Sequence, residues 1–262
     1  SRVAWMTALA MLAFAANSLL CRLALRGGHI DAASFTTLRL GSGALILWVI
    51  VRARGVTGVH GNWLSAMALF AYAAGFSFAY LTLPASVGAL LLFGAVQATM
   101  IGYGLWQGER LRLVQSGGLA LACTGLVILM LPGLAAPPLG GALMMVVAGI
   151  AWGVYSLRGR GVGNATASTA GNFIRGLPLA AALSALTLTQ ASLDAAGVAY
   201  ALASGAIASG LGYAIWYSAL PGLRATSAAT IQLSVPVIAT LSASALLDEA
   251  ITWRLIAASL AV

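Results

Sequence analysis

The sequence predicts an all-α polytopic membrane protein in which ten transmembrane helices form two inverted five-helix repeats around a central cavity. Hydrophobic residues make up 61% of the 262 residues and charged residues only 7%, too few to cover a water-soluble fold. The apolar runs are continuous and about as long as a membrane helix, whereas the strands of a transmembrane barrel alternate in polarity. The features of the first half of the chain also recur, in the same order, in the second half.

The stretch between Gly61 and Gly108 sets the length of the predicted helices. It contains no Asp, Glu, Lys or Arg and is too long for one crossing of a hydrocarbon core about 30 Å thick, so it predicts two helices joined by a turn at Pro84. In order, the predicted helices cover roughly residues 3–25, 33–51, 63–81, 84–107, 112–131, 139–157, 168–189, 196–219 and 225–247, and a tenth begins near Trp253 and is cut short at Val262.

Residues that recur at a nearly constant spacing indicate the repeat. The matched pairs lie 136 to 140 residues apart: Arg22 with Arg158, Arg39 with Arg175, Tyr80 with Tyr217, Pro84 with Pro221, and Glu109 with Glu249. We therefore predict a first five-helix repeat over residues 1–131 and a second over residues 132–262, joined in the Pro- and Gly-rich stretch 131–138. Because each repeat has an odd number of helices, the second must be inserted upside down relative to the first.

The arginines predict the orientation of the helices. With the N-terminus in the cytoplasm, three arginines lie outside (Arg22, Arg26 and Arg254), and the larger cytoplasmic group comprises Arg2, Arg52, Arg54, Arg110, Arg112, Arg158, Arg160 and Arg224. This excess supports a cytoplasmic N-terminus, because cytoplasmic loops are enriched in basic residues. The net charge of +8 comes from these scattered arginines, so it indicates topology and not a nucleic-acid surface.

Several of these residues resemble a known family. The Ala151-Trp152-Gly153 step, Arg39 and Arg175 in the second helix of each repeat, and the run Gly108-Glu109-Arg110-Leu111 are similar to the drug/metabolite transporter superfamily, and more narrowly to its bacterial EamA-type exporters. The resemblance covers essentially the whole chain, except the short tenth helix and Ala15-Ala16-Asn17, where the family has a Trp-Gly step. The overall character is similar to the YddG-type exporters of aromatic amino acids.

The resemblance implies a multi-pass protein of the bacterial inner (plasma) membrane that exports small metabolites by alternating access through the central cavity. Amino acids, aromatic and other neutral ones, are the expected substrates. The alternative is efflux of drugs or cationic compounds, or of a metabolite such as a nucleoside or sugar, by proton antiport; an intramembrane enzyme or a channel is more remote. The expected partners are the small-molecule substrate and the lipid bilayer, without cofactor, metal or nucleic acid, for a monomeric protein.

Polar and aromatic side chains deep in the segments predict the solute site. Polar groups that face lipid are costly, so these residues should face a cavity or another helix. An aromatic ring in a cavity wall can stack on a flat solute or attract its ammonium group. The candidate substrate-binding residues are Asn17, Tyr80, Phe93, Gln97, Trp152, Tyr155, Trp216, Tyr217, Thr230 and Ser234. Packing or hydrogen bonding between helices is the alternative for each of them.

Pro236 lies inside the ninth predicted helix. Its ring should break the hydrogen bond to the carbonyl of Gln232 and kink the helix. We expect either a hinge for gating at this point or a freed carbonyl, beside Thr230 and Ser234, that accepts a hydrogen bond from a substrate.

Four charged residues are expected to have structural roles. Arg39 and Arg175 could meet a substrate carboxylate, but such arginines more often snorkel to lipid headgroups or tie two helices together. Glu109 and Glu249 should hold loops by a salt bridge or by helix capping. Because all five acidic residues fall at segment ends or in loops, passive alternating access is favoured over a proton relay through a core carboxylate.

An enzyme is not expected. His29 and His60 lie in or near loops of different segments, and the sequence has no His/Cys/Asp cluster, no Walker loop and no nucleophile elbow.

Overall fold

The computed structural model describes residues 2–56, 58–108, 117–118, 120–121, 124–125, 137–160, 162–219 and 231–261. Within these ranges the chain is helical with short connections, and the only strand-like pairing is an isolated bridge between Ile30 and Leu193. The all-helical class predicted from the composition is therefore confirmed. Most of the predicted fifth segment, with Glu109, and the start of the ninth, with Thr230, lie outside the described residues.

The helices follow the predicted apolar segments closely. Those of the first half are α1 (Arg2–Arg26), α2 (Ala32–Ala53), α3 (Trp63–Ala79) and α4 (Ala85–Trp106). Those of the second half are α6 (Leu139–Arg158), α7 (Ala165–Leu186), η1 (Leu188–Gln190), α8 (Ala195–Ala203), η2 (Ser204–Leu211), α9 (Gly212–Ala219), α11 (Ser234–Leu247) and α12 (Trp253–Ala261). Among the described residues, five stretches are long and apolar enough to cross a membrane, namely α1, α2, α4, α6 and the continuous stretch Ala195–Ala219.

Short polar side chains begin several of the helices. Asp31 accepts hydrogen bonds from the backbone of Ala33 and Ser34 at the start of α2. Asn62, Asn164 and Asp194 cap α3, α7 and α8 in the same way. The first backbone N–H groups of a helix have no partner within it, so these side chains fix where each helix starts.

The predicted ninth helix is interrupted. A turn at Leu233 separates residues 231–232 from α11, which begins at Ser234. Pro236 therefore lies in the first turn of α11 and not inside a continuous helix, because the missing N–H of a proline is tolerated where the backbone needs no intrahelical partner.

A π-helical segment, η2, divides the stretch Ala195–Ala219. It packs against α1 and α2, and its backbone comes so close to α2 that a Cβ atom on Gly205 would lie 2.1 Å from the carbonyl oxygen of Arg39. Only glycine allows this approach. Single π-helical turns within membrane and soluble helices often mark functional sites.

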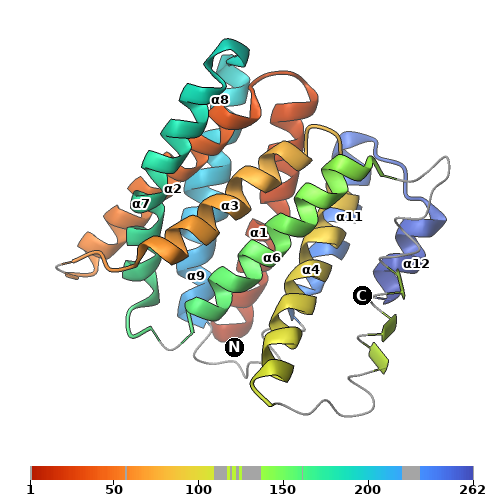
Figure 1. Ribbon diagram of the computed structural model, residues 1–262, viewed down its shortest axis with the longest axis horizontal. Helices are drawn as coiled ribbons and strands as arrows, with labels where there is room; N and C mark the ends of the chain where they lie inside the picture. The colour runs from red at the N-terminus through yellow and green to blue at the C-terminus, as the bar shows by residue number, and fades with distance from the viewer. Residues whose placement is uncertain are drawn as a thin grey trace.

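The helices pack mainly across the two halves of the chain. In Figure 1, α3 and α6 lie side by side at the front, α2 and α7 lie together on one side, and α4 and α11 lie on the other. Helix α1 contacts α9, η2, α8 and α11. The polar and aromatic side chains described below lie between these helices.

At each end of the bundle, backbone hydrogen bonds join segments that are distant in the sequence. At one end, which we call the Arg22 end, the backbone N–H of Asp31 donates to the Ser192 carbonyl and that of Asp194 to the His29 carbonyl, both at 2.8 Å. At the other, the Arg158 end, the N–H of His60 donates to the Ala167 carbonyl at 3.1 Å. The first two hydrogen bonds join the connection before α2 to the connection after α7. The third joins the connection after α2 to the first turn of α7.

Candidate functional site

A narrow central cavity lies in the middle of the bundle. The space that its walls leave free holds about one water molecule, so a solute can occupy it only after the wall side chains move apart. The lining residues come from α1, α3, α4, α6, η2 and α9: Phe14, Asn17, Ser18, Tyr72, Phe76, Leu92, Phe93, Trp152, Ala208 and Tyr213. The wall is therefore apolar and aromatic, with a few polar atoms, as in most small-molecule sites.

Trp152 is the centre of the aromatic wall. Its ring centroid lies 4.8 Å from that of Tyr72, 5.0 Å from that of Tyr213 and 5.5 Å from that of Tyr155. Phe14 packs edge-on against Trp152 and Tyr213. Offset and edge-to-face pairs of this kind hold one another in place, so the wall presents fixed aromatic surfaces to whatever occupies the cavity.

A chain of hydrogen bonds crosses the same region. The Ser204 hydroxyl donates to Asn17 Oδ1 at 2.6 Å, and Asn17 Nδ2 donates to the Tyr72 hydroxyl at 3.3 Å. Arg39 Nη2 also donates to the Tyr72 hydroxyl, at 2.8 Å, and Arg39 Nε donates to Ser209 at 3.3 Å. This series of hydrogen bonds joins α1, α2, α3 and η2. Buried polar groups that are fully paired make the surrounding side chains more rigid.

A second cavity, which we call the end cavity, lies at the Arg158 end and is also narrow, with room for about one or two water molecules. Arg158 lines it and donates from Nε to the Ser65 hydroxyl and from Nη2 to Asn62 Oδ1, both at 3.0 Å. Its other lining residues include Tyr155, Ser168, Thr169, Asn172 and Tyr217. The end cavity is thus more polar than the central one.

Trp152 and Tyr155 separate the two cavities. Trp152 lines the central cavity and Tyr155 lines the end cavity, and their rings lie one helical turn apart on α6 with a 31° tilt.

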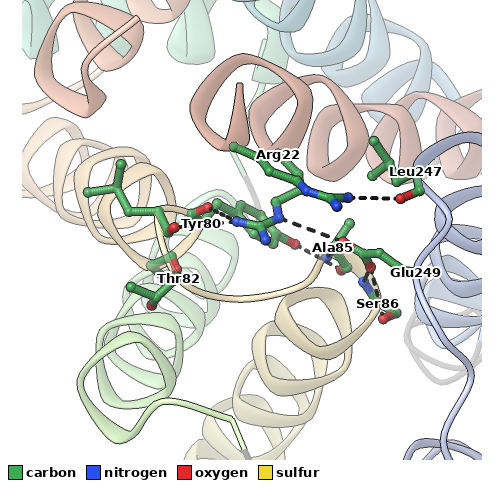
Figure 2. Close-up of polar contacts among 10 residues, drawn as sticks. Arg22, Tyr80, Thr82, Ala85, Ser86, Leu247 and Glu249 are labelled. Carbon is green, nitrogen blue, oxygen red and sulfur yellow. Dashed lines mark hydrogen bonds and ion pairs between the residues drawn. The ribbon is translucent and has the colours of Figure 1, made fainter. Parts of the chain in front are cut away.

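The Arg22 end is closed by a network of polar contacts (Figure 2). Glu249 accepts hydrogen bonds from the backbone N–H groups of Ala85 and Ser86 at the start of α4 and lies 3.7 Å from Arg22 Nε. Arg22 Nη1 donates to the carbonyl of Tyr80 at 2.9 Å. Arg26 Nη1 donates to the carbonyl of Leu247 at 2.8 Å. These contacts hold the ends of α1, α3 and α11 and the start of α4 together.

The structure distributes the predicted substrate-binding residues over several places. Asn17, Phe93 and Trp152 line the central cavity, whereas Tyr155 and Tyr217 line the end cavity. Trp216 packs edge-on against Phe14, outside the lining. These residues all belong to one aromatic and polar region that continues through the bundle.

The remaining predicted site residues lie elsewhere. Tyr80 is fully buried and its hydroxyl donates to the Ala85 carbonyl at the Arg22 end. Gln97, one turn beyond Phe93 on α4, is half-buried and is not among the residues that line the two cavities. Ser234 donates to the Ile231 carbonyl, at the break before α11.

The charged residues also have defined partners. Arg39 joins α2 to α3 and η2, and Arg175 donates to the carbonyls of His60 and Gly171 at the Arg158 end. Glu249 caps α4 and pairs with Arg22. The contacts of Arg39 and the contact of Arg175 with His60 join different elements, and Arg39, only 1% exposed, does not extend to a membrane surface.

Sequence reasoning missed Phe14, Tyr72 and Tyr213 as cavity residues. Two weak signals, neither of which identifies a cavity face, concern Tyr72 and Tyr213, and Phe14 had none. Tyr72 lies four residues before Phe76, so both share one face of α3, and Tyr213 follows Phe76 by 137 residues, the offset of the Tyr80 and Tyr217 pair.

The arrangement suits recognition of a solute more than a reaction. Within the described ranges, no three His, Cys, Asp or Glu residues are grouped so that they could hold a metal ion. The cavity offers ring faces, an amide, hydroxyls and a nearby guanidinium, groups that bind and orient a small molecule.

Fold and cavities together define a multi-pass helical membrane protein with an aromatic, partly polar interior. The chain belongs to the EamA-like transporter family, a family of membrane transporters within the drug/metabolite transporter superfamily. The family profile matches residues 139–262.

Two comparisons extend over the whole chain. An uncharacterized protein of Pseudomonas aeruginosa, PA1977, is 57% identical over 263 residues, which cover 100% of this chain and 92% of that protein. A solved structure, described as "Crystal structure of protein", has a similar fold, with a TM-score of 0.73 over 100% of this chain and 94% of its own at 19% identity.

Proposed function

We propose that this protein exports amino acids, aromatic and other neutral ones, by alternating access through the central cavity, as a YddG-type member of its family. The observation that carries the proposal is the central cavity itself, where ring faces of Trp152, Tyr72 and Phe93 meet the polar side chain of Asn17 inside the bundle. A flat or apolar side chain would lie against the rings, and the polar part of an amino acid would meet the hydrogen-bonding groups.

The neighbours of the helices support two equivalent halves. If α1, α2, α3 and α4 correspond to α6, α7, the Ala195–Ala219 stretch and α11, then each contact across the halves should recur after the exchange. Helices α9 and η2 are both parts of the Ala195–Ala219 stretch. The contact between α3 and α6 corresponds to that between α9 and α1, the contact between α4 and α6 to that between α11 and α1, and the contact between α3 and α7 to that between η2 and α2. All six contacts are present.

The directions of the helices support an inverted arrangement. Arg22, near the end of α1, binds the carbonyl of Tyr80 at the end of α3. Arg158, at the end of α6, binds Asn62 and Ser65 at the start of α3. Helices α1 and α6 therefore run in opposite directions, which is what two repeats of opposite orientation require.

The described arginines support a cytoplasmic Arg158 end. Helix α1 starts at that end, so Arg2, Arg52, Arg54, Arg158 and Arg160 gather there, whereas Arg22 and Arg26 lie at the opposite end. The positive-inside rule supports a cytoplasmic N-terminus, and a multi-pass helical protein of a bacterium with this orientation would lie in the inner membrane. The described state then has a cavity toward the cytoplasm and a closed outer end.

Transport would proceed by opening the two ends in turn. A solute enters through the end cavity, passes Trp152 and Tyr155, and occupies the central cavity while the contacts of Glu249 keep the Arg22 end closed. Separation of Arg22 from Glu249 then opens the opposite end. A conformational cycle of this kind needs two states of similar free energy, biased by the solute.

Counterflow in proteoliposomes tests the proposal. Vesicles loaded with an unlabelled amino acid should accumulate the same labelled amino acid, and the uptake should saturate. A panel that includes phenylalanine, leucine, a cationic drug, a nucleoside and a sugar, each with and without a pH gradient, identifies the substrate class. Counterflow of the drug, nucleoside or sugar alone, or flux that does not saturate, would overturn amino acid export.

A further inference from the structure

Arg39 is a buried cation with an unused hydrogen-bonding group. Its side chain is 1% exposed in the middle of the bundle, and its Nη1 atom has no hydrogen-bond partner. Its Nε donates a hydrogen bond to the Ser209 hydroxyl, and its Nη2 donates one to the Tyr72 hydroxyl. One edge of the guanidinium, the edge that a carboxylate would occupy with two parallel hydrogen bonds, is therefore only partly satisfied.

The described part of the protein supplies no anion for this cation. Its acidic residues all lie at helix ends: Asp31 caps α2, Asp194 caps α8, Glu249 caps α4, and Asp248 is exposed. The ion pairs within the described residues are those of Arg22 with Glu249 and of His29 with Asp194. A charge kept away from water without a counter-ion is costly, so its presence calls for a compensating interaction.

Aromatic rings compensate part of this cost. The Arg39 guanidinium carbon lies 5.0 Å from the centroid of Tyr72 and 4.8 Å from that of Phe76. Both distances fit cation–π contacts, which stabilise a desolvated arginine but leave its N–H groups free to donate. The two rings also line the central cavity, so the guanidinium contacts the cavity wall directly, although it is not itself a lining residue.

We propose that Arg39 binds the carboxylate of the transported solute. The solute's apolar or aromatic part would lie against Trp152 and Tyr213, and its carboxylate would accept two parallel hydrogen bonds from Arg39 Nη1 and Nη2 after the Tyr72 hydroxyl moves away from Nη2. The proposal rests on the central cavity being the solute site, and it adds that carboxylates, and not amines, are the group that the site selects.

A pair of matched probes tests this selection in the full-length protein. 3-Phenylpropionate and 2-phenylethylamine share a phenyl ring and a two-carbon chain and differ in the terminal charge. We expect the purified protein in detergent to bind 3-phenylpropionate more tightly, measured by tryptophan fluorescence. Arg39→Gln should weaken that binding roughly 30-fold or more, the usual effect of removing one partner of a buried charge pair, and leave 2-phenylethylamine binding unchanged.

Arg175→Gln is the matched control. Arg175 lies at the equivalent position of the second repeat, but it donates to backbone carbonyls of His60 and Gly171 at the Arg158 end. The control should leave the binding of both probes unchanged. Equal loss of both probes in Arg39→Gln, no loss of either, or tighter binding of the amine by the unaltered protein would each overturn the proposal.

A second variant keeps the test decisive if Arg39→Gln does not yield a monodisperse protein. Arg39→Lys keeps the charge but loses the planar fork, so it should bind 3-phenylpropionate roughly fivefold or more weakly than the unaltered protein does and bind 2-phenylethylamine unchanged. Unchanged affinity in Arg39→Lys would overturn carboxylate binding through the fork.

Failure of this inference and failure of the proposed function give different results. Selective, Arg39-dependent binding of 3-phenylpropionate without counterflow of any amino acid would contradict export and support the carboxylate site. Counterflow of an amino acid that is unaffected by Arg39→Gln would support export and overturn the carboxylate site.

Discussion

The Glu249 carboxylate lies 3.7 Å from Arg22 Nε, and the same carboxylate accepts two backbone hydrogen bonds at the start of α4, from Ala85 and Ser86. One side chain, 8% exposed, thus joins α1 to α4 and to the connection after α11. An ion pair that also caps a helix is worth more than an exposed pair, because both the charge and the helix terminus favour it.

Glu249→Gln should open the Arg22 end. The neutral amide cannot pair with Arg22 and can serve fewer of the N–H groups of α4, so we expect the closed state to lose about 1 kcal/mol, or about fivefold in population. The measurement is the rate at which a membrane-impermeant maleimide, added from outside, labels a cysteine at Ser18 in a variant with Cys21 and Cys123 replaced by alanine. The rate should rise about fivefold, in proportion to the open population.

Asp248→Asn serves as the control for this experiment. Asp248 is the exposed neighbour of Glu249 and has a φ of 52°, a left-handed conformation that asparagine also tolerates. Its labelling rate should equal that of the parent. Equal rates for all three proteins would show that Glu249 does not hold this end closed.

Trp152→Ala should abolish saturable counterflow. Trp152 is 7% exposed and contacts the rings of Tyr72, Tyr155 and Tyr213, so its removal deletes the main stacking surface and leaves a hole. It should also lower stability by about 3 kcal/mol. Trp152→Phe, which keeps a ring, separates the two effects: it should fold normally and transport with a raised half-saturation concentration. The 80% exposed Trp106, changed to alanine, should transport normally.

Asn17 and Ser204 should be energetically coupled. Their hydrogen bond, 2.6 Å long and buried, joins α1 to η2. A double-mutant cycle with Asn17→Ala and Ser204→Ala, followed by denaturation in mixed micelles, should give a coupling free energy of about 0.6 kcal/mol and at most about 2 kcal/mol, as found for hydrogen bonds between membrane helices. Purely additive effects would contradict the hydrogen bond.

Asp31 should make the folding stability of the protein decrease at acidic pH. Burial raises the pKa of its carboxyl, but hydrogen bonds from Ser34, Ser192 and Ala33 outweigh burial, so the pKa lies below the ordinary value. Because the folded-state pKa is the lower one, the stabilisation is complete above the unfolded-state pKa of about 3.9 and is lost as the pH falls through the folded-state pKa. The melting temperature in detergent, measured from neutral pH downward, should show this loss.

Asp31→Asn isolates the titration. Asparagine can still cap α2 but carries no titratable group, so the protein should remain folded at neutral pH and its melting temperature should fall less between neutral and acidic pH than that of the parent. An identical decrease in both proteins would assign the acid sensitivity to other groups.

The helical class and the positions of most described helices were predictable because the membrane restricts the choices. Long apolar runs must form helices there, and prolines and capping residues such as Pro84 and Asp31 mark where the helices begin. The π-helical geometry of Ser204–Leu211 was not predictable, since no residue pattern distinguishes it from an α-helix. The break at Leu233 was displaced from the expected kink, because the position at which a helix yields near a proline depends on its packing.

The polar and aromatic character of the central cavity was predictable, but only some of the residues that line it were. Deep polar and aromatic positions gave Asn17, Phe93 and Trp152, since such side chains avoid lipid. Tyr72 and Phe14 were missed because helices that are surrounded by other helices show little difference between their faces, so the sequence does not say which face meets a cavity. The burial of Arg39 was equally hidden, because depth depends on the neighbouring helices and not on the distance from the helix end.

The backbone contacts at both ends of α2 and α7 have a mechanical consequence. The connections of these two helices are joined at one end through Asp31 and Ser192 and at the other through His60 and Ala167, and the helices also touch along their length. We therefore expect α2 and α7 to form the stationary scaffold of the cycle, about which the remaining helices tilt. Arg39 lies on this scaffold, so a cargo held by it would stay in place while the protein moves around it.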